Sequence, residues 1–140
     1  MTSVAEQLFC FAVQGRRLAL DHARVCELRR PDALAPWTEA APDPGGGWWR
    51  HARDGLAILQ LAPRFGAPAL RPREGVVVVA RFGEAQIGLW VDSVEGGCLL
   101  PEPFEPQASS MMGCGLEAAL PGGVVGLLDL PSLLAGGWGQ

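Results

Sequence analysis

The sequence predicts an all-β protein built from short strands. The clearest stretch is residues 75–95, where four consecutive valines (Val76–Val79) favour extended backbone. A charged break containing Gly83 separates them from a second apolar run, Ile87–Val91, so this region is predicted to be a β-hairpin. At least six such apolar stretches alternate with turn residues, and no long amphipathic helix competes with them, which favours β-barrels over an α/β sheet.

The N-terminal third is predicted to begin with another hairpin. Its strands are Leu8–Val13 and a second one through Leu18–Leu20, joined by a turn at Gln14–Arg17. Asp21 is of the residue type that caps helices, and it is expected to start a short helical turn that leads into an extended segment at Val25–Leu28.

Two further strands are each followed by a proline-started turn of helix. The first strand is predicted within Gly55–Leu61 and the second within Val124–Leu128. The segments Leu59–Gly66 and Leu128–Leu134 therefore form a faint internal echo.

Other stretches lack a regular pattern. Residues 31–47 hold four prolines and three consecutive glycines, so we expect a mobile loop there. Residues 107–119 are rich in small residues and are also expected to be irregular. The adjacent Trp48 and Trp49 either pack against the core or form an exposed patch for a partner.

Composition limits the function classes. The 140 residues are 49% hydrophobic, enough for one domain with a real core. The net charge of −4 argues against a general nucleic-acid binder, which needs an excess of basic residues. No apolar run approaches the roughly 20 residues that span a bilayer, and no basic segment marks a secretory signal at the start. We therefore expect a cytoplasmic protein without direct membrane insertion.

The sequence holds no recognisable catalytic, cofactor or metal motif. The four cysteines form no Cys-x-x-Cys pair, and neither His22 nor His51 has a second ligand at helical spacing. Phosphate loops, dinucleotide fingerprints and nucleophile elbows are also missing. We therefore predict a protein that is not an enzyme and needs no cofactor. The alternative is a small β-barrel enzyme or ligand sensor that uses Cys114 or His51.

The order of segments resembles the CheW-like domain family. Residues 11–28 resemble its opening strand, turn, strand and "V-x-E" segment, and residues 56–66 resemble its "D-L" strand with a following "F-G". Residues 76–100 resemble its central hairpin, with the sharpest match at Val91-Asp92-Ser93-Val94. Residues 124–134 resemble its closing strand. The resemblance covers about residues 8–134 and leaves 135–140 as a C-terminal tail.

The resemblance implies two intertwined SH3-like subdomains of five strands each. It also implies a signal-transduction adaptor that couples the tip of a methyl-accepting chemoreceptor to the regulatory domain of a CheA-type histidine kinase. The residues that match the family's motifs are the expected protein-binding residues: Val25, Glu27, Arg53, Val91, Asp92 and Val94. The segment 48–55 departs from the family's "N-L-R-G" pattern, so a second possibility is a decoy or regulator that binds the kinase without a receptor.

Overall fold

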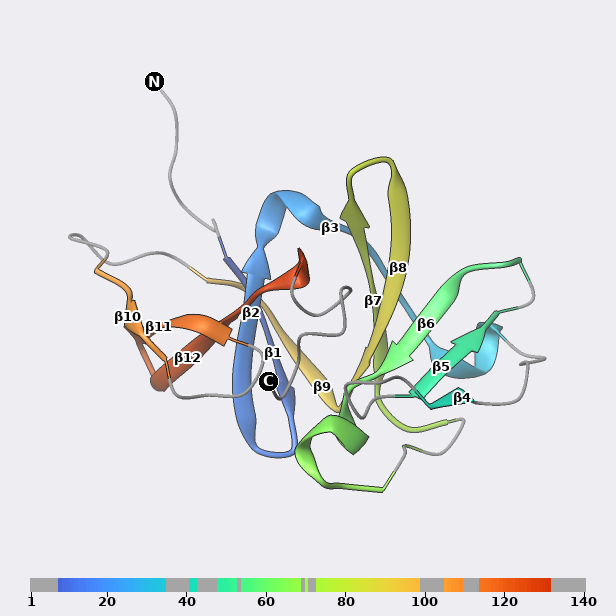
Figure 1. Ribbon diagram of the computed structural model, residues 1–140, viewed down its shortest axis with the longest axis horizontal. Helices are drawn as coiled ribbons and strands as arrows, with labels where there is room; N and C mark the ends of the chain where they lie inside the picture. Colours follow the sequence, from blue (N-terminus) through green and yellow to red (C-terminus); the bar gives the residue numbers. More distant parts are fainter. Residues whose placement is uncertain are drawn as a thin grey trace.

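The computed structural model describes residues 8–34, 41–42, 48–52, 54–68, 70, 73–98, 105–109 and 114–131. These residues form two six-stranded sheets (Figure 1). The first sheet has the order β10-β11-β12-β2-β1-β9 and the second has the order β3-β7-β8-β6-β5-β4. In the first sheet the strands are β1 (Leu8–Val13), β2 (Arg16–Asp21), β9 (Ser93–Cys98), β10 (Gln107–Ala108), β11 (Cys114–Leu120) and β12 (Gly123–Leu128).

The second sheet holds β3 (Val25–Arg29), β4 (Ala41–Pro42), β5 (Trp48–His51), β6 (Ala57–Gln60), β7 (Val76–Phe82) and β8 (Ala85–Val91). Three short 3-10 helices connect strands: η1 (His22–Arg24), η2 (Pro31–Leu34) and η3 (Ala62–Phe65). The Asp21 side chain caps η1 by accepting a hydrogen bond from the Ala23 backbone, as the sequence predicts.

The two halves of the chain exchange their hairpins. The first sheet combines hairpin β1–β2 with β9 to β12, whereas the second combines hairpin β7–β8 with β3 to β6. In both sheets the exchanged hairpin joins the other strands through a parallel pair, β2 with β12 and β8 with β6. The strands β6 and β12 therefore occupy equivalent positions in their sheets, each paired in parallel with the second strand of a hairpin. This equivalence matches the weak sequence repeat between residues 59–66 and 128–134.

The core lies in three clusters that follow the alternation of side chains along the strands. A central cluster lies between the sheets, where Phe9, Phe11 and Leu18 face Val78, Leu89 and Val91. The opposite faces carry a second cluster around Ile58, Val77 and Trp90 and a third around Cys10, Ala19 and Val125. Residues Val77–Ala80 are all buried because β7 has a cluster on each face, as its apolar run predicts.

The all-β fold of two subdomains is confirmed, and each sheet has six strands because a two-residue strand, β4 or β10, extends the five that the resemblance implies. One local expectation is wrong, because residues 107–119 contain β10 and most of β11. Of the segment 31–47, for which a mobile loop is predicted, the structure describes η2 and β4, and the other residues lie outside the described part of the chain. Small residues fit strands when cross-strand neighbours supply the packing, which residue composition alone does not reveal. The proposed tail, 135–140, lies outside the described residues.

Candidate functional site

The strand β3 forms one edge of the second sheet and leaves its side chains largely exposed. Its inner side pairs with β7, and no other described strand pairs with its outer side. Cys26, Glu27 and Leu28 are exposed, and Leu28 keeps 45% of its surface accessible, although leucine is usually buried. The register shifts between Val25 and Glu27, so Cys26 is the extra residue of a β-bulge.

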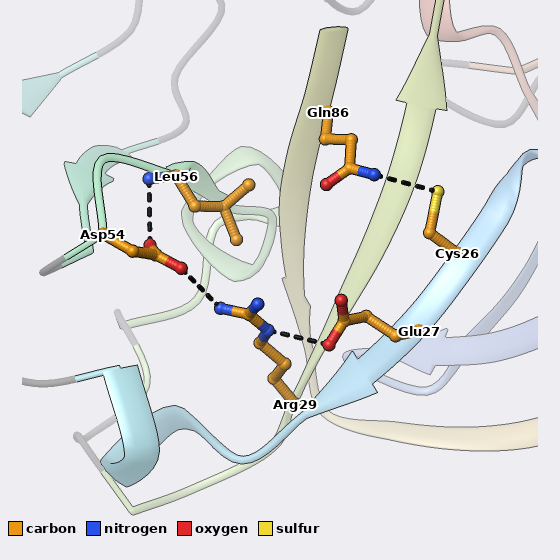
Figure 2. A network of polar contacts seen from close by, with 6 residues as sticks. All are labelled: Cys26, Glu27, Arg29, Asp54, Leu56 and Gln86. Atoms are coloured by element: carbon orange, nitrogen blue, oxygen red, sulfur yellow. Dashed lines mark hydrogen bonds and ion pairs between the residues drawn. The ribbon is translucent and has the colours of Figure 1, made fainter.

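Ion pairs connect this edge strand to the turn that precedes β6 (Figure 2). The Arg29 guanidinium donates from Nε to Oε1 of Glu27 at 2.9 Å and from Nη1 to Oδ2 of Asp54 at 2.8 Å. The second carboxylate oxygen of Asp54 accepts a hydrogen bond from the Leu56 backbone N–H at 3.2 Å. One guanidinium thus bridges a carboxylate of its own strand and a carboxylate 25 residues further along the chain.

The same contacts set the ionisation of the cluster. Hydrogen bonds from Arg29 and then from the Leu56 backbone hold the pKa of Asp54 below its ordinary value. The two carboxylates, Glu27 first, raise the pKa of Arg29. The cluster combines two carboxylates with one guanidinium, so its own charges leave an excess of negative charge.

A small open cleft lies beside the ion pairs. Its volume is about 260 Å³, and Arg29, Asp54, Gly55, Leu56, Val79 and Gln86 line it. The Gln86 amide donates a hydrogen bond to the Cys26 sulfur at 3.6 Å, so the bulge also contacts this wall (Figure 2). Small-molecule pockets usually exceed about 300 Å³ and have mostly apolar walls. This cleft instead is small, open and lined largely by polar groups.

The structure separates the six predicted binding residues into different places. Glu27 is part of the edge-strand cluster, and Val25 begins the same strand but packs half-buried against the central cluster. Arg53 lies outside the described residues. Val91 is fully buried between the sheets, and Val94 is half-buried against the same cluster. Among the predicted residues that are described, only Glu27 therefore presents an exposed side chain in the cluster.

Asp92 connects two distant turns. Its Oδ2 accepts a hydrogen bond from the Gln14 backbone N–H at 2.9 Å, and its own N–H donates to the Ala12 carbonyl at 3.0 Å. Gln14 has a φ of 52° and Gly15 a φ of 76°, the pair of positive angles of a type I′ hairpin turn. Asp92 thus stabilises the β1–β2 turn, which sequence reasoning did not anticipate.

The alternative nucleophile is poorly placed for chemistry. Cys114 is the first residue of β11 and retains only 7% of its surface exposed. Burial, with smaller contributions from Glu117 and Asp129, raises the pKa of its thiol to about 12, so little thiolate exists at neutral pH. The side chain of His51 lies outside the described residues. No group of three metal-ligating side chains occurs among the residues that are described.

Sequence reasoning missed the partners of Glu27. Residues 27 and 29 alternate with 28 along a strand, so opposite charges on one face were a detectable signal for the pair with Arg29. No sequence pattern predicts that Asp54 pairs with Arg29. The turn that carries Asp54 comes close to β3 only because β6 pairs with β8 and β8 pairs with β7.

Comparison with known proteins agrees with this architecture. A family model described as the CheW-like domain matches residues 7–136, nearly the whole chain. The chain belongs to the CheW-like domain family. A solved structure of the scaffolding protein TtCheW from Thermoanaerobacter tengcongensis superposes with a TM-score of 0.66 over 89% of each chain, at 16% identity, so the fold is shared. No curated protein matches the chain in sequence.

Membership in this family sets the general function. CheW-like proteins are non-catalytic scaffolds, so this chain is not an enzyme but a chemotaxis-type scaffold or adaptor. The helical segments that the structure describes are all too short to cross a membrane.

Proposed function

We propose that this CheW-like protein is a cytoplasmic adaptor that couples a chemoreceptor to a CheA-type histidine kinase, with the edge strand β3 as its receptor-docking surface. The observation that carries the proposal is the exposed edge strand β3, which presents Leu28 on one face and the Glu27–Arg29–Asp54 cluster on the other. A partner that wraps around this edge can meet both an apolar side chain and charged groups, which together are typical of a protein-binding surface. The strand begins at Val25, next to the core shared by both sheets.

The structure of the edge favours recognition by side chains over strand addition. An exposed edge can add a partner strand, but a β-bulge and charged residues are two devices that discourage this pairing. Here the bulge at Cys26 and the charged pair Glu27–Arg29 occupy the edge strand. A helical partner such as the receptor tip can lie against the edge and contact Leu28 on one face and the charged cluster with its cleft on the other, without pairing its backbone.

The charge of the cluster indicates which side chain fits. Because carboxylates outnumber the guanidinium, a basic side chain of the receptor finds a favourable potential near Glu27 and Asp54. Arg29 holds both carboxylates in place and so preorganises the surface before the partner arrives.

Calorimetry with two partners tests the proposal. The protein is titrated with a peptide hairpin of the cognate receptor tip and, separately, with the regulatory domain of the cognate kinase. Glu27→Arg is expected to weaken receptor binding about tenfold, equivalent to about 1.4 kcal/mol, because it places two cations side by side. Kinase binding should stay within about twofold of wild type. Glu105→Arg, the same charge reversal at an exposed residue ahead of β10, is the matched control.

Different outcomes contradict different parts of the proposal. Equal losses for Glu27→Arg and Glu105→Arg would show that only net charge matters. Kinase binding without any receptor binding by wild type would favour the decoy, as the departures in residues 48–55 suggest. Failure of both partners to bind at tens of micromolar would count against the adaptor role altogether.

A further inference from the structure

Two cysteines that are far apart in the sequence, Cys10 and Cys98, lie on neighbouring strands of the first sheet. The antiparallel register pairs Cys10 of β1 with Gly96 and pairs Leu8 with Cys98 of β9. Cys10 and Cys98 are thus diagonal neighbours on the same face of the sheet, because positions two apart on a strand share a face. Cys10 belongs to the third cluster, and the half-buried Cys98 packs against that cluster.

The two thiols differ in accessibility. Cys10 has no exposed surface, whereas Cys98 is half-buried and lines an open cleft of about 300 Å³ together with Arg17, Glu95 and Leu120. The thiol of Cys98 donates a hydrogen bond to the Gly96 carbonyl at 3.7 Å, and, after burial, its proximity is one cause of the raised pKa of Cys10. A small oxidant in the cleft can therefore reach Cys98 first, with Cys10 buried at the diagonal position on the neighbouring strand.

We propose that Cys10 and Cys98 form a redox-reversible disulfide that fixes the edge strand β9 to β1. In the first step the Cys98 thiol loses its proton and its sulfur attacks the terminal oxygen of a hydroperoxide; the O–O bond breaks, a sulfenic acid forms, and the leaving alkoxide or hydroxide takes up the proton to become an alcohol or water. In the second step the Cys10 sulfur attacks the Cys98 sulfur and displaces hydroxide, which leaves as water with the Cys10 proton. The two sulfurs together lose two electrons, and the peroxide gains two.

The geometry makes this disulfide labile. Diagonal cross-strand Cα atoms are typically about 7–8 Å apart, whereas disulfides usually join Cα atoms about 4.4–6.8 Å apart. Closure must draw the end of β9 toward β1, and β9 can move because it is an edge strand with a bulge at Glu95. A strained, partly exposed disulfide is easily reduced, which suits a transient regulatory bond in a reducing compartment.

Burial also determines the speed of the reaction. Desolvation, with the neighbouring Cys98, raises the pKa of Cys10 to about 12, so its thiol is a poor nucleophile at neutral pH. The second step is therefore the slow one, and we expect the disulfide to form over minutes to hours.

Peptide mass spectrometry on the full chain tests the proposal. Wild type and Cys26→Ser are treated with millimolar hydrogen peroxide, quenched with iodoacetamide and digested without reductant. Cys26→Ser removes an exposed thiol that could otherwise form disulfides between molecules. In both proteins we expect a peptide linked through Cys10 and Cys98 and full reversal by dithiothreitol, and in Cys26→Ser we expect the loss of two free thiols. Amide hydrogen exchange in β9 should slow severalfold on oxidation.

Two results would contradict the proposal, one for the disulfide itself and one for its effect on β9. Accumulation of sulfinic acid at Cys98 without the linked peptide would show that the two sulfurs do not meet. A linked peptide with unchanged hydrogen exchange in β9 would refute the fixing of the strand. The Cys26→Ser, Cys98→Ser double variant should lose no thiols, and because the wild-type measurement stands alone, a folding defect in this variant leaves the test intact.

Discussion

Replacing Asp92 with alanine should lower the stability of the fold without removing a contact residue. The family resemblance marks Asp92 as a binding residue, but its carboxylate accepts the Gln14 backbone N–H at 2.9 Å. Gln14 holds a left-handed φ of 52°, which costs a non-glycine residue about 1–2 kcal/mol. The Asp92 contact offsets that cost from a position 78 residues away.

The magnitude follows from three contributions. A hydrogen bond to a charged acceptor stabilises a protein by about 1.5–3 kcal/mol. Gln14 is exposed, so water can replace part of the lost contact. The other oxygen of Asp92, Oδ1, is buried without a hydrogen-bond partner, and its removal returns some desolvation free energy. We therefore expect Asp92→Ala to lower the free energy of unfolding by about 1–2 kcal/mol.

Urea unfolding followed by tryptophan fluorescence measures this loss, which corresponds to a drop in Tm of about 3–6 °C for a domain of this size. Asp92→Asn keeps an acceptor for Gln14 and should lose about half as much. Glu27→Ala is the comparison variant, because its exposed ion pair contributes at most a few tenths of a kcal/mol. Receptor binding should show the reverse order, with Glu27→Ala weaker than Asp92→Ala.

If the Asp92→Ala variant is as stable as wild type but loses receptor affinity, this reasoning is refuted and Asp92 is a binding residue. Equal stability of the alanine and asparagine variants would show that the Gln14 hydrogen bond is not the cause.

Three further outcomes follow from single contacts. Gly75→Ala should cost about 2–4 kcal/mol in urea unfolding, because a Cβ at a φ of 78° would collide with the Val91 carbonyl oxygen; wild-type stability would contradict this. Since Arg29 lowers the pKa of Asp54, the stabilisation is present above the ordinary aspartate pKa and lost as pH falls through the lowered value. Carboxyl NMR titration should show that pKa rising in Arg29→Gln, and no change would exclude the ion pair. Cys114 should react with iodoacetamide far more slowly than an exposed thiol, and equal labelling would contradict its burial.

Most individual strands could be predicted from the sequence because their signals are local. The valine run of β7, the glycine in the β7–β8 turn and the Asp21 cap depend on residues within a few positions of each other. The strand β9 was missed as a separate element, since Ser93–Cys98 alternates between small and polar residues without an apolar stripe. Its pairing with β1, about 85 residues away, makes it a strand.

The candidate site was only partly predictable for the same reason. Glu27 came from a family motif, and its neighbour Arg29 was visible in the strand pattern. Asp54 joins them through an ion pair that forms only after the second sheet has assembled. Val91, predicted as a contact residue, is enclosed because both sheets cover it.

The sequence by itself determined the all-β class, the two tight hairpins and the lack of catalytic motifs, because backbone preference and turn chemistry act over a few residues. Only the tertiary structure decided which half of the chain each hairpin joins, and therefore which side of β3 stays open and which cysteines become neighbours. These features depend on pairing between strands far apart in the chain, where hydrogen bonds and apolar burial select the partner and no local preference encodes it.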